Sequence, residues 1–173
     1  SANEMNLPAG YPYQQRKLGF EWPSADRHTR LSEVLGKPGP HSLEDSMRLQ
    51  NDVVSVPARR VVALLKELDA SDARTRDALV LLKGWKFAED AGSPGAALFG
   101  VWWSRYLGPL FKEVALGKTG AAAMGDPDTS VLLDGLEHPQ AYLGTDAVAK
   151  RDWVLQTSLA LAWANTVQLL GND

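Results

Sequence analysis

Histidine is the side chain best suited to proton transfer and metal binding near neutral pH. The sequence holds three of them, His28, His41 and His138, and they are scattered along the chain. None stands in an HxxxH or HExxH spacing, which would place two metal ligands on one face of a helix. We therefore interpret all three as surface or capping residues, and we predict that the chain binds no metal.

Carboxylates come in two local pairs, Glu44 with Asp45 and Glu89 with Asp90. Paired carboxylates perform acid–base catalysis when an apolar setting raises the pKa of one of them, and neither pair has such a setting. The sequence also lacks a nucleophile elbow, a phosphate-binding loop and a complete catalytic triad. Residue types and spacing alone thus indicate solvated acidic faces and no recognisable active site.

Two further features allow a functional and a structural interpretation. The adjacent Trp102 and Trp103 could line a ligand cage, but paired tryptophans on a helix are more typical of a core and its edge. Arg59 and Arg60, beside Pro57, could bind an anion, but solvation at the helix end or a salt bridge to Asp52 accounts for them as well. We favour the structural interpretation of both.

The composition excludes several classes of protein. The chain has 173 residues, of which 45% are apolar, so it can bury a core. Its 18 basic and 21 acidic residues are mixed along the sequence and leave a net charge of -3, which argues against nucleic acid and anionic membranes as partners. It has no cysteine, so disulfides and thiolate metal sites are excluded. No apolar run is long enough for membrane insertion.

The stretch around which the chain is predicted to pack is a helix over residues 93–116. Ser93 and Pro94 form a typical helix start, because Ser accepts an amide hydrogen bond and Pro lacks the donor that the first position would waste. Apolar residues then recur at three- and four-residue steps over a wide arc, which predicts neighbours on several sides. Gly108 and Pro109 predict a kink or a break within this helix.

Other segments have helical patterns as well. We expect helix starts at Ser24, Ser42, Pro57, Ser71 and Thr145, and a further short helix over residues 129–136. Residues 117–127 are rich in Gly and Ala and predict a mobile connection. No strand pattern of useful length competes, so the fold class is mainly α, an irregular helical domain. We divide the chain into an extended or loop segment over residues 1–23 and a helical domain over residues 24–173.

Two long segments carry recognisable motifs, residues 41–65 and residues 81–103, of which the second is a Gly-Trp turn before a helix with paired tryptophans. They resemble two successive recurring segments of the penicillin acylase family, the N-acyl amide hydrolases with an N-terminal nucleophile. The resemblance covers nearly the whole chain. Its remaining motifs are Ala2-Asn3, Pro8, Tyr11-Pro12, residues 19–22, Ala25-Asp26-Arg27 and Arg151-Asp152.

The resemblance implies a place within a larger αββα hydrolase. Family members cleave themselves and expose a Ser at the start of a large β subunit, where it attacks the amide carbonyl with its own α-amino group as base. This chain resembles an internal segment of that subunit, downstream of the nucleophile. We therefore expect Ser1 not to be the nucleophile and the isolated chain to be inactive, with the α subunit and the rest of the β subunit as its partners.

The resemblance also implies site residues. The Ala-Asn context makes Asn3 the expected oxyanion-hole residue, with Asn6 as the alternative, because gapless alignment to members with an Ala-Asn-x-Asn pattern puts the second Asn on Met5. Arg27 corresponds by this resemblance to a family Arg near the nucleophile's amino group, and the alternative is an exposed residue in the first turn of a helix. Phe20 and Trp22 are expected near the acyl-binding pocket, although core packing explains them equally well.

We expect no metal and no cofactor, because Arg16 stands where some members carry an acidic calcium ligand. The substrate implied is a small N-acyl amide, and family habit implies a periplasmic or secreted protein. Two alternatives remain open from the sequence. One is a helical structural or protein-interaction domain without catalysis, and the other is a small independent hydrolase that uses Ser1.

Overall fold

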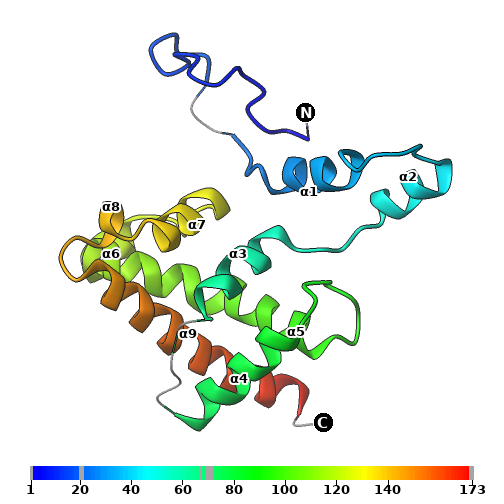
Figure 1. Cartoon of the computed structure of the whole chain (residues 1–173). Coiled ribbons are helices and arrows are strands. Elements are labelled where there is room, and N and C mark those ends of the chain that lie inside the picture. The colour runs from blue at the N-terminus through cyan, green and yellow to red at the C-terminus, as the bar shows by residue number, and fades with distance from the viewer. Residues whose placement is uncertain (1, 20–21, 67, 69–71, 172–173) are drawn as a thin grey trace. The chain divides into compact units, whose positions relative to one another are not determined.

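The computed structural model describes residues 2–19, 22–66, 68 and 72–171. The chain is mainly α, as predicted, and its described residues form helices joined by loops, with one isolated antiparallel bridge between Val54 and Ala88 (Figure 1). Its contacts divide it into two compact units, residues 1–52 and residues 53–173. The predicted division between residues 23 and 24 stays a prediction.

Three helices form the centre of the second unit. α5 (Pro94–Trp102) leads through a π-helical turn, Trp103–Leu107, into α6 (Gly108–Ala123), and α9 (Ala147–Leu170) packs along all three segments (Figure 1). The predicted start of α5 is confirmed, since the Ala96 amide donates a 3.3 Å hydrogen bond to Ser93 Oγ. The wide apolar arc of this stretch is thus explained by helices that cover it on several sides.

The described residues of this unit form four further, shorter helices: α3 (Val56–Leu64), α4 (Ala73–Gly84), α7 (Thr129–Glu137) and α8 (Gln140–Leu143). α4 packs against α5 and α9, α3 packs against α7, and α8 packs against α9. Their inward faces form one continuous core. Its fully buried large side chains include Val61, Leu65, Leu82, Leu98, Trp102, Leu107, Leu133, Leu136, Val154, Leu155 and Leu159.

The Gly108-Pro109 step changes the helix type without breaking the helix. Pro109 has no amide hydrogen to donate, and its ring would clash with the carbonyl of the preceding turn of a regular α-helix. The chain widens into the π-helical turn just before this step and stays helical at Gly108, with φ -61° and ψ -50°. The helix is interrupted later, at Gly117, where φ is 70° and ψ is 167°. Residues 117–123 are therefore helical around this interruption, so the predicted connection over residues 117–127 was wrong for residues 117–123, while residues 124–127 do connect α6 to the next helix.

The first unit contains α1 (Asp26–Leu35) and α2 (Leu43–Gln50). The start of α2 is as predicted, because Ser42 and Asp45 form a reciprocal capping box, and these hydrogen bonds hold the pKa of Asp45 below its usual range. The start of α1 differs from the prediction. Its cap position is Ala25, and Ser24 Oγ instead donates a 2.6 Å hydrogen bond to Asp26 Oδ2.

An ion pair connects α1 to the segment after α2. Arg30 donates from Nε and Nη2 to the two oxygens of Asp52, at 2.9 and 2.6 Å, and from Nη1 to Glu33 Oε2 at 3.1 Å. The bond to Asp52 is the main cause that raises the pKa of Arg30. No apolar side chain among residues 2–19 and 22–52 is fully buried, so this unit is organised by polar contacts.

Two other helices also begin at residues that differ from the prediction. α4 is capped by Asp72, whose Oδ1 accepts the Thr75 amide at 3.1 Å, while Ser71 lies outside the described residues. α9 begins after Asp146, a left-handed residue with φ 55°, and its start has no side-chain cap from Thr145. Within the described ranges, none of the helices has the length and hydropathy that a bilayer-spanning segment requires.

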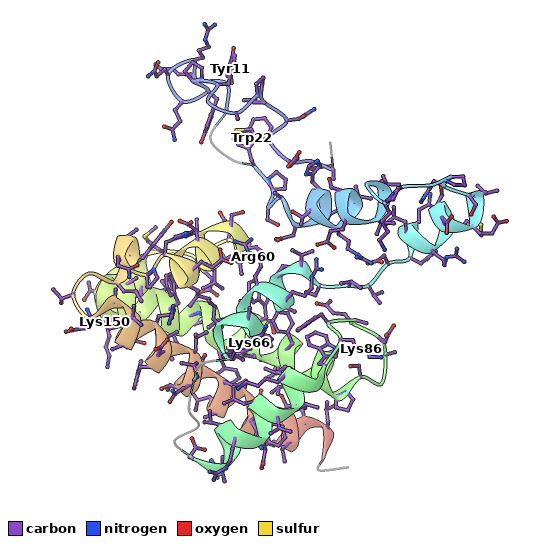
Figure 2. All side chains as sticks on the ribbon, in the orientation of Figure 1. Tyr11, Trp22, Arg60, Lys66, Lys86 and Lys150 are labelled. Carbon is purple, nitrogen blue, oxygen red and sulfur yellow. The ribbon has the colours of Figure 1, made fainter. Side chains whose placement is uncertain are left out.

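A bidentate ion pair joins α3 to α7. Arg60 donates from Nε and Nη2 to the two oxygens of Glu137, both at 2.7 Å, and the pKa of Glu137 is lowered chiefly by these bonds (Figure 2 labels Arg60). In the same helix the pKa of Asp134 is lowered by the hydroxyl of Tyr142 and by His138. Both carboxylates are more acidic in the folded state than in the unfolded chain, so their stabilisation is present above the unfolded pKa values, roughly 4, and is lost as the pH falls through the folded values.

Replacing Glu137 by glutamine should therefore destabilise the chain by about 0.5–1 kcal/mol at pH 7, since the pair is partly exposed. The difference in the free energy of unfolding between Glu137→Gln and the unchanged chain should shrink as the pH falls from about 4 through the lowered pKa of Glu137, below which both chains are uncharged at this position. Urea unfolding of both chains at a series of pH values measures this difference in the free energy of unfolding. Glu113→Gln, at an exposed position, is the matched control. A difference that stays constant with pH would contradict this explanation.

Candidate functional site

Asn3 lies in a tight turn near the beginning of the described chain. Ala2 and Asn3 both have left-handed backbone conformations, with φ values of 45° and 64°. Asn adopts this conformation more readily than most residues, whereas for Ala it costs roughly 1–2 kcal/mol. The Asn3 side chain is exposed and, within the described residues, its amide has no hydrogen-bond partner. An amide donor is thus presented outward from a constrained turn.

Arg27 lies in the first turn of α1. Its side chain is exposed and has no ion pair or hydrogen bond with any residue in the described ranges. Its neighbour Asp26 is 92% buried, with 8% of its surface exposed, and accepts the hydrogen bond from Ser24. The first turn of α1 thus buries the Asp26 carboxylate and exposes the Arg27 guanidinium beside it.

One contact brings these two regions together. Glu4 Oε2 lies 3.2 Å from His28 Nδ1, with 17% of the Glu4 side chain and 45% of the His28 side chain exposed. Glu4 directly follows Asn3, and His28 directly follows Arg27. The turn that carries the predicted oxyanion residue is therefore held against the helix turn that carries the predicted Arg.

This contact has no signal in the sequence, because Glu4 and His28 lie far apart in the chain and match no local motif. The prediction of His28 as a surface or capping residue therefore did not include Glu4 as its partner. On its other side, His28 Nε2 lies 3.4 Å from Ser32 Oγ, which gives the order acid, imidazole and hydroxyl. Ser32 lies inside α1, where helix hydrogen bonds occupy the backbone amides that an oxyanion would need. The arrangement therefore orients the imidazole and does not form a hydrolytic triad.

The predicted acyl-pocket residues are only partly described. Trp22 is 41% exposed, and a side chain at Gly19 would come within 3.3 Å of its indole ring. Phe20 lies outside the described residues, and so does Ser1. Asn6, the alternative oxyanion residue, is exposed and lacks a hydrogen-bond partner in the part of the chain described. The pocket role of Phe20 and Trp22 and the choice between Asn3 and Asn6 stay predictions.

Arg16 makes an aromatic contact. By the family resemblance, it stands at a position where some relatives carry an acidic metal ligand. Its guanidinium carbon lies 5.5 Å from the centre of the Tyr11 ring, a cation–π arrangement (Figure 2 labels Tyr11). Across residues 2–19, 22–66, 68 and 72–171, no group of three His, Asp or Glu side chains is placed to hold a metal ion. The absence of a metal in the working protein stays a prediction.

The second unit has a cavity of about 360 Å³ beside α3 and α4. Lys66 and Lys83 are among the residues that line it, and Lys83 Nζ is 3.5 Å from the Lys66 carbonyl oxygen. Lys83 is in the last turn of α4, and Lys66 follows the C-cap of α3, so each positive charge offsets a helix dipole. The helix dipoles thus account for the two lysines without an anionic ligand.

Comparison with known proteins identifies a family for this chain. No curated protein matches the chain in sequence. The sequence model of the penicillin amidase family matches residues 1–173, the whole length of the chain. This match agrees with the order of motifs from Ala2-Asn3 to Arg151-Asp152 and with the helical fold. The chain therefore belongs to the penicillin amidase family of acylase-like hydrolases.

Proposed function

We propose that these residues form an internal part of the β subunit of a penicillin-amidase-type enzyme that hydrolyses N-acyl amide bonds. In this proposal they supply the oxyanion-hole amide and a positioned Arg, and the nucleophile lies on residues outside this sequence. The observation that carries the proposal is the contact between Glu4 and His28, which holds the Asn3 turn against the start of α1 beside Arg27. The family match over all 173 residues supports the reaction class.

Asn3 would act on the charge that develops during attack. A tetrahedral intermediate carries an oxyanion, and a donor fixed in advance stabilises it without having to reorganise. Asn3 meets this requirement in two respects, because its amide is exposed and its backbone is held in a left-handed turn. Asn6 is the alternative donor for the same role.

Arg27 would act on the base. The α-amino group of an N-terminal nucleophile must be neutral to accept the proton of the hydroxyl. A guanidinium close to an amine lowers the pKa of that amine, because the two positive charges repel each other. The exposed Arg27 side chain is available for this role, since no acid in the described residues neutralises it.

The proposed partner is the remainder of the same precursor. Among the described residues of the first unit, Leu18, Trp22, Leu35, Leu43 and Met47 expose between 41% and 73% of their surface. A segment that buries so little apolar surface by itself gains stability when it packs on another surface. In the complete enzyme Phe20 and Trp22 would face the acyl group, and the parent protein would be periplasmic or secreted.

Release of a chromophore from a panel of aryl and alkyl N-acyl amides tests this proposal. The panel is measured with the purified 173-residue chain and with the complete product of its gene. We expect turnover by the complete protein and none by the 173-residue chain. Turnover by the chain alone that disappears in Ser1→Ala would favour the independent hydrolase instead. Turnover by neither would favour a structural or interaction domain, which should then show saturable partner binding.

A further inference from the structure

We propose that Glu4 and His28 are positioning residues that set the orientation of the Asn3 amide in the oxyanion hole. This inference rests on the proposed function of Asn3. The observation behind it is a pair of polar side chains, each adjacent to a predicted site residue, that meet at 3.2 Å between a loop and a helix.

The turn before Glu4 needs such a restraint. Two consecutive residues, Ala2 and Asn3, have positive φ values, and neither is glycine. Left-handed conformations of this kind persist when the surrounding structure fixes them. Glu4 leaves this turn with its side chain only 17% exposed, so its contact with α1 fixes the direction in which the chain leaves Asn3.

His28 is itself held on the helix side. Its Nδ1 faces Glu4 Oε2 at 3.2 Å, and its Nε2 lies 3.4 Å from Ser32 Oγ one turn along α1. Contacts at both nitrogens fix the plane of the imidazole, and the backbone hydrogen bonds of α1 fix its base. A rigid helix thus positions a turn that has no buried apolar residue of its own.

A donor in an oxyanion hole contributes fully only when its hydrogen points at the developing charge, so small displacements have large kinetic effects. Loss of the contact between Glu4 and His28 should therefore lower kcat and leave KM nearly unchanged, because the ground-state substrate does not carry the oxyanion. Neither Glu4 nor His28 needs to touch the substrate for this effect.

The test is a double-mutant cycle in the complete enzyme, with kcat and KM measured on an N-acyl amide. Glu4→Ala and His28→Ala should each lower kcat about tenfold, and Glu4→Gln, which keeps an oxygen acceptor for Nδ1–H, should recover most of the loss. In an Asn3→Ala background, the same substitutions should change kcat by less than about twofold, because the group they position is gone. His41→Ala is the matched control, since His41 is an exposed histidine of the same unit with no partner in its described part.

The outcomes separate this inference from the proposed function. If Asn3→Ala has wild-type kcat, the proposed function of Asn3 fails, and the inference fails with it. If Asn3→Ala lowers kcat while Glu4→Ala and His28→Ala do not, only the inference is overturned. It is also overturned if the Glu4 and His28 substitutions lower kcat equally in the presence and absence of Asn3. If an alanine variant fails to fold, His28→Phe keeps the test decisive, because it keeps an aromatic ring but removes both nitrogen contacts and should lower kcat about tenfold.

Discussion

Replacing Asn3 by alanine is expected to lower kcat of the complete enzyme about 10²–10³-fold, because it removes one donor from the oxyanion hole. KM should change far less, since the oxyanion exists only after attack. Steady-state kinetics on a chromogenic N-acyl amide measures both parameters. The size of the loss in kcat depends on how well the direction of the Asn3 amide is fixed before the substrate binds. The left-handed turn at Asn3 helps to fix that direction.

Asn6→Ala is the companion variant for this prediction. Asn6 has the same side chain, lies three positions further along and is also exposed. We expect Asn6→Ala to keep kcat within about threefold of the unchanged enzyme, a surface effect that is small beside the loss of a donor. If the large loss occurs in Asn6→Ala instead, the oxyanion role belongs to Asn6. If neither variant loses activity, the oxyanion donor is not in this turn.

Replacing Trp102 by alanine is expected to reduce the free energy of unfolding by about 3–5 kcal/mol. Trp102, the last residue of α5, has no exposed surface and packs edge-on against Phe99 with ring centres 6.3 Å apart. Its indole Nε1 donates a 2.7 Å hydrogen bond to Ser158 Oγ, which in turn donates to the Leu155 carbonyl at 3.3 Å. The substitution therefore creates a cavity and removes a buried hydrogen bond at the same point.

Trp153→Ala is the matched control, because Trp153 is on the same helix as Ser158 and is 53% exposed. It should cost less than about 1 kcal/mol, as is usual for surface substitutions. Trp102→Phe should fall between the two, since phenylalanine fills part of the space but cannot donate to Ser158. Thermal and urea unfolding followed by circular dichroism measure all three. Equal losses in Trp102→Ala and Trp153→Ala would contradict the assignment of Trp102 to the core.

The helical fold could be predicted from the sequence because its signals are local. The cap residues Ser42 and Ser93 bond to amides three positions ahead, so the residue types in a short window determine those helix starts. The apolar period that follows the predicted start at Thr145 indicated the C-terminal helix, α9, for the same reason. Local signals gave a wrong prediction at Ser24, where several polar residues compete for the position that caps the helix. They also gave a wrong prediction in residues 117–123, where glycines lie within a helix.

The sequence by itself determined that the chain is helical, that it resembles the penicillin acylase family, and that Asn3 and Arg27 are the residues to test. Only the tertiary structure decided which distant residues meet: Glu4 with His28, Arg60 with Glu137, and Trp102 with Ser158. A helix hydrogen bond spans four residues and can be predicted within a short window. Each of these three contacts instead joins elements far apart in the chain, so its formation depends on the path of everything between them and on how the helices pack.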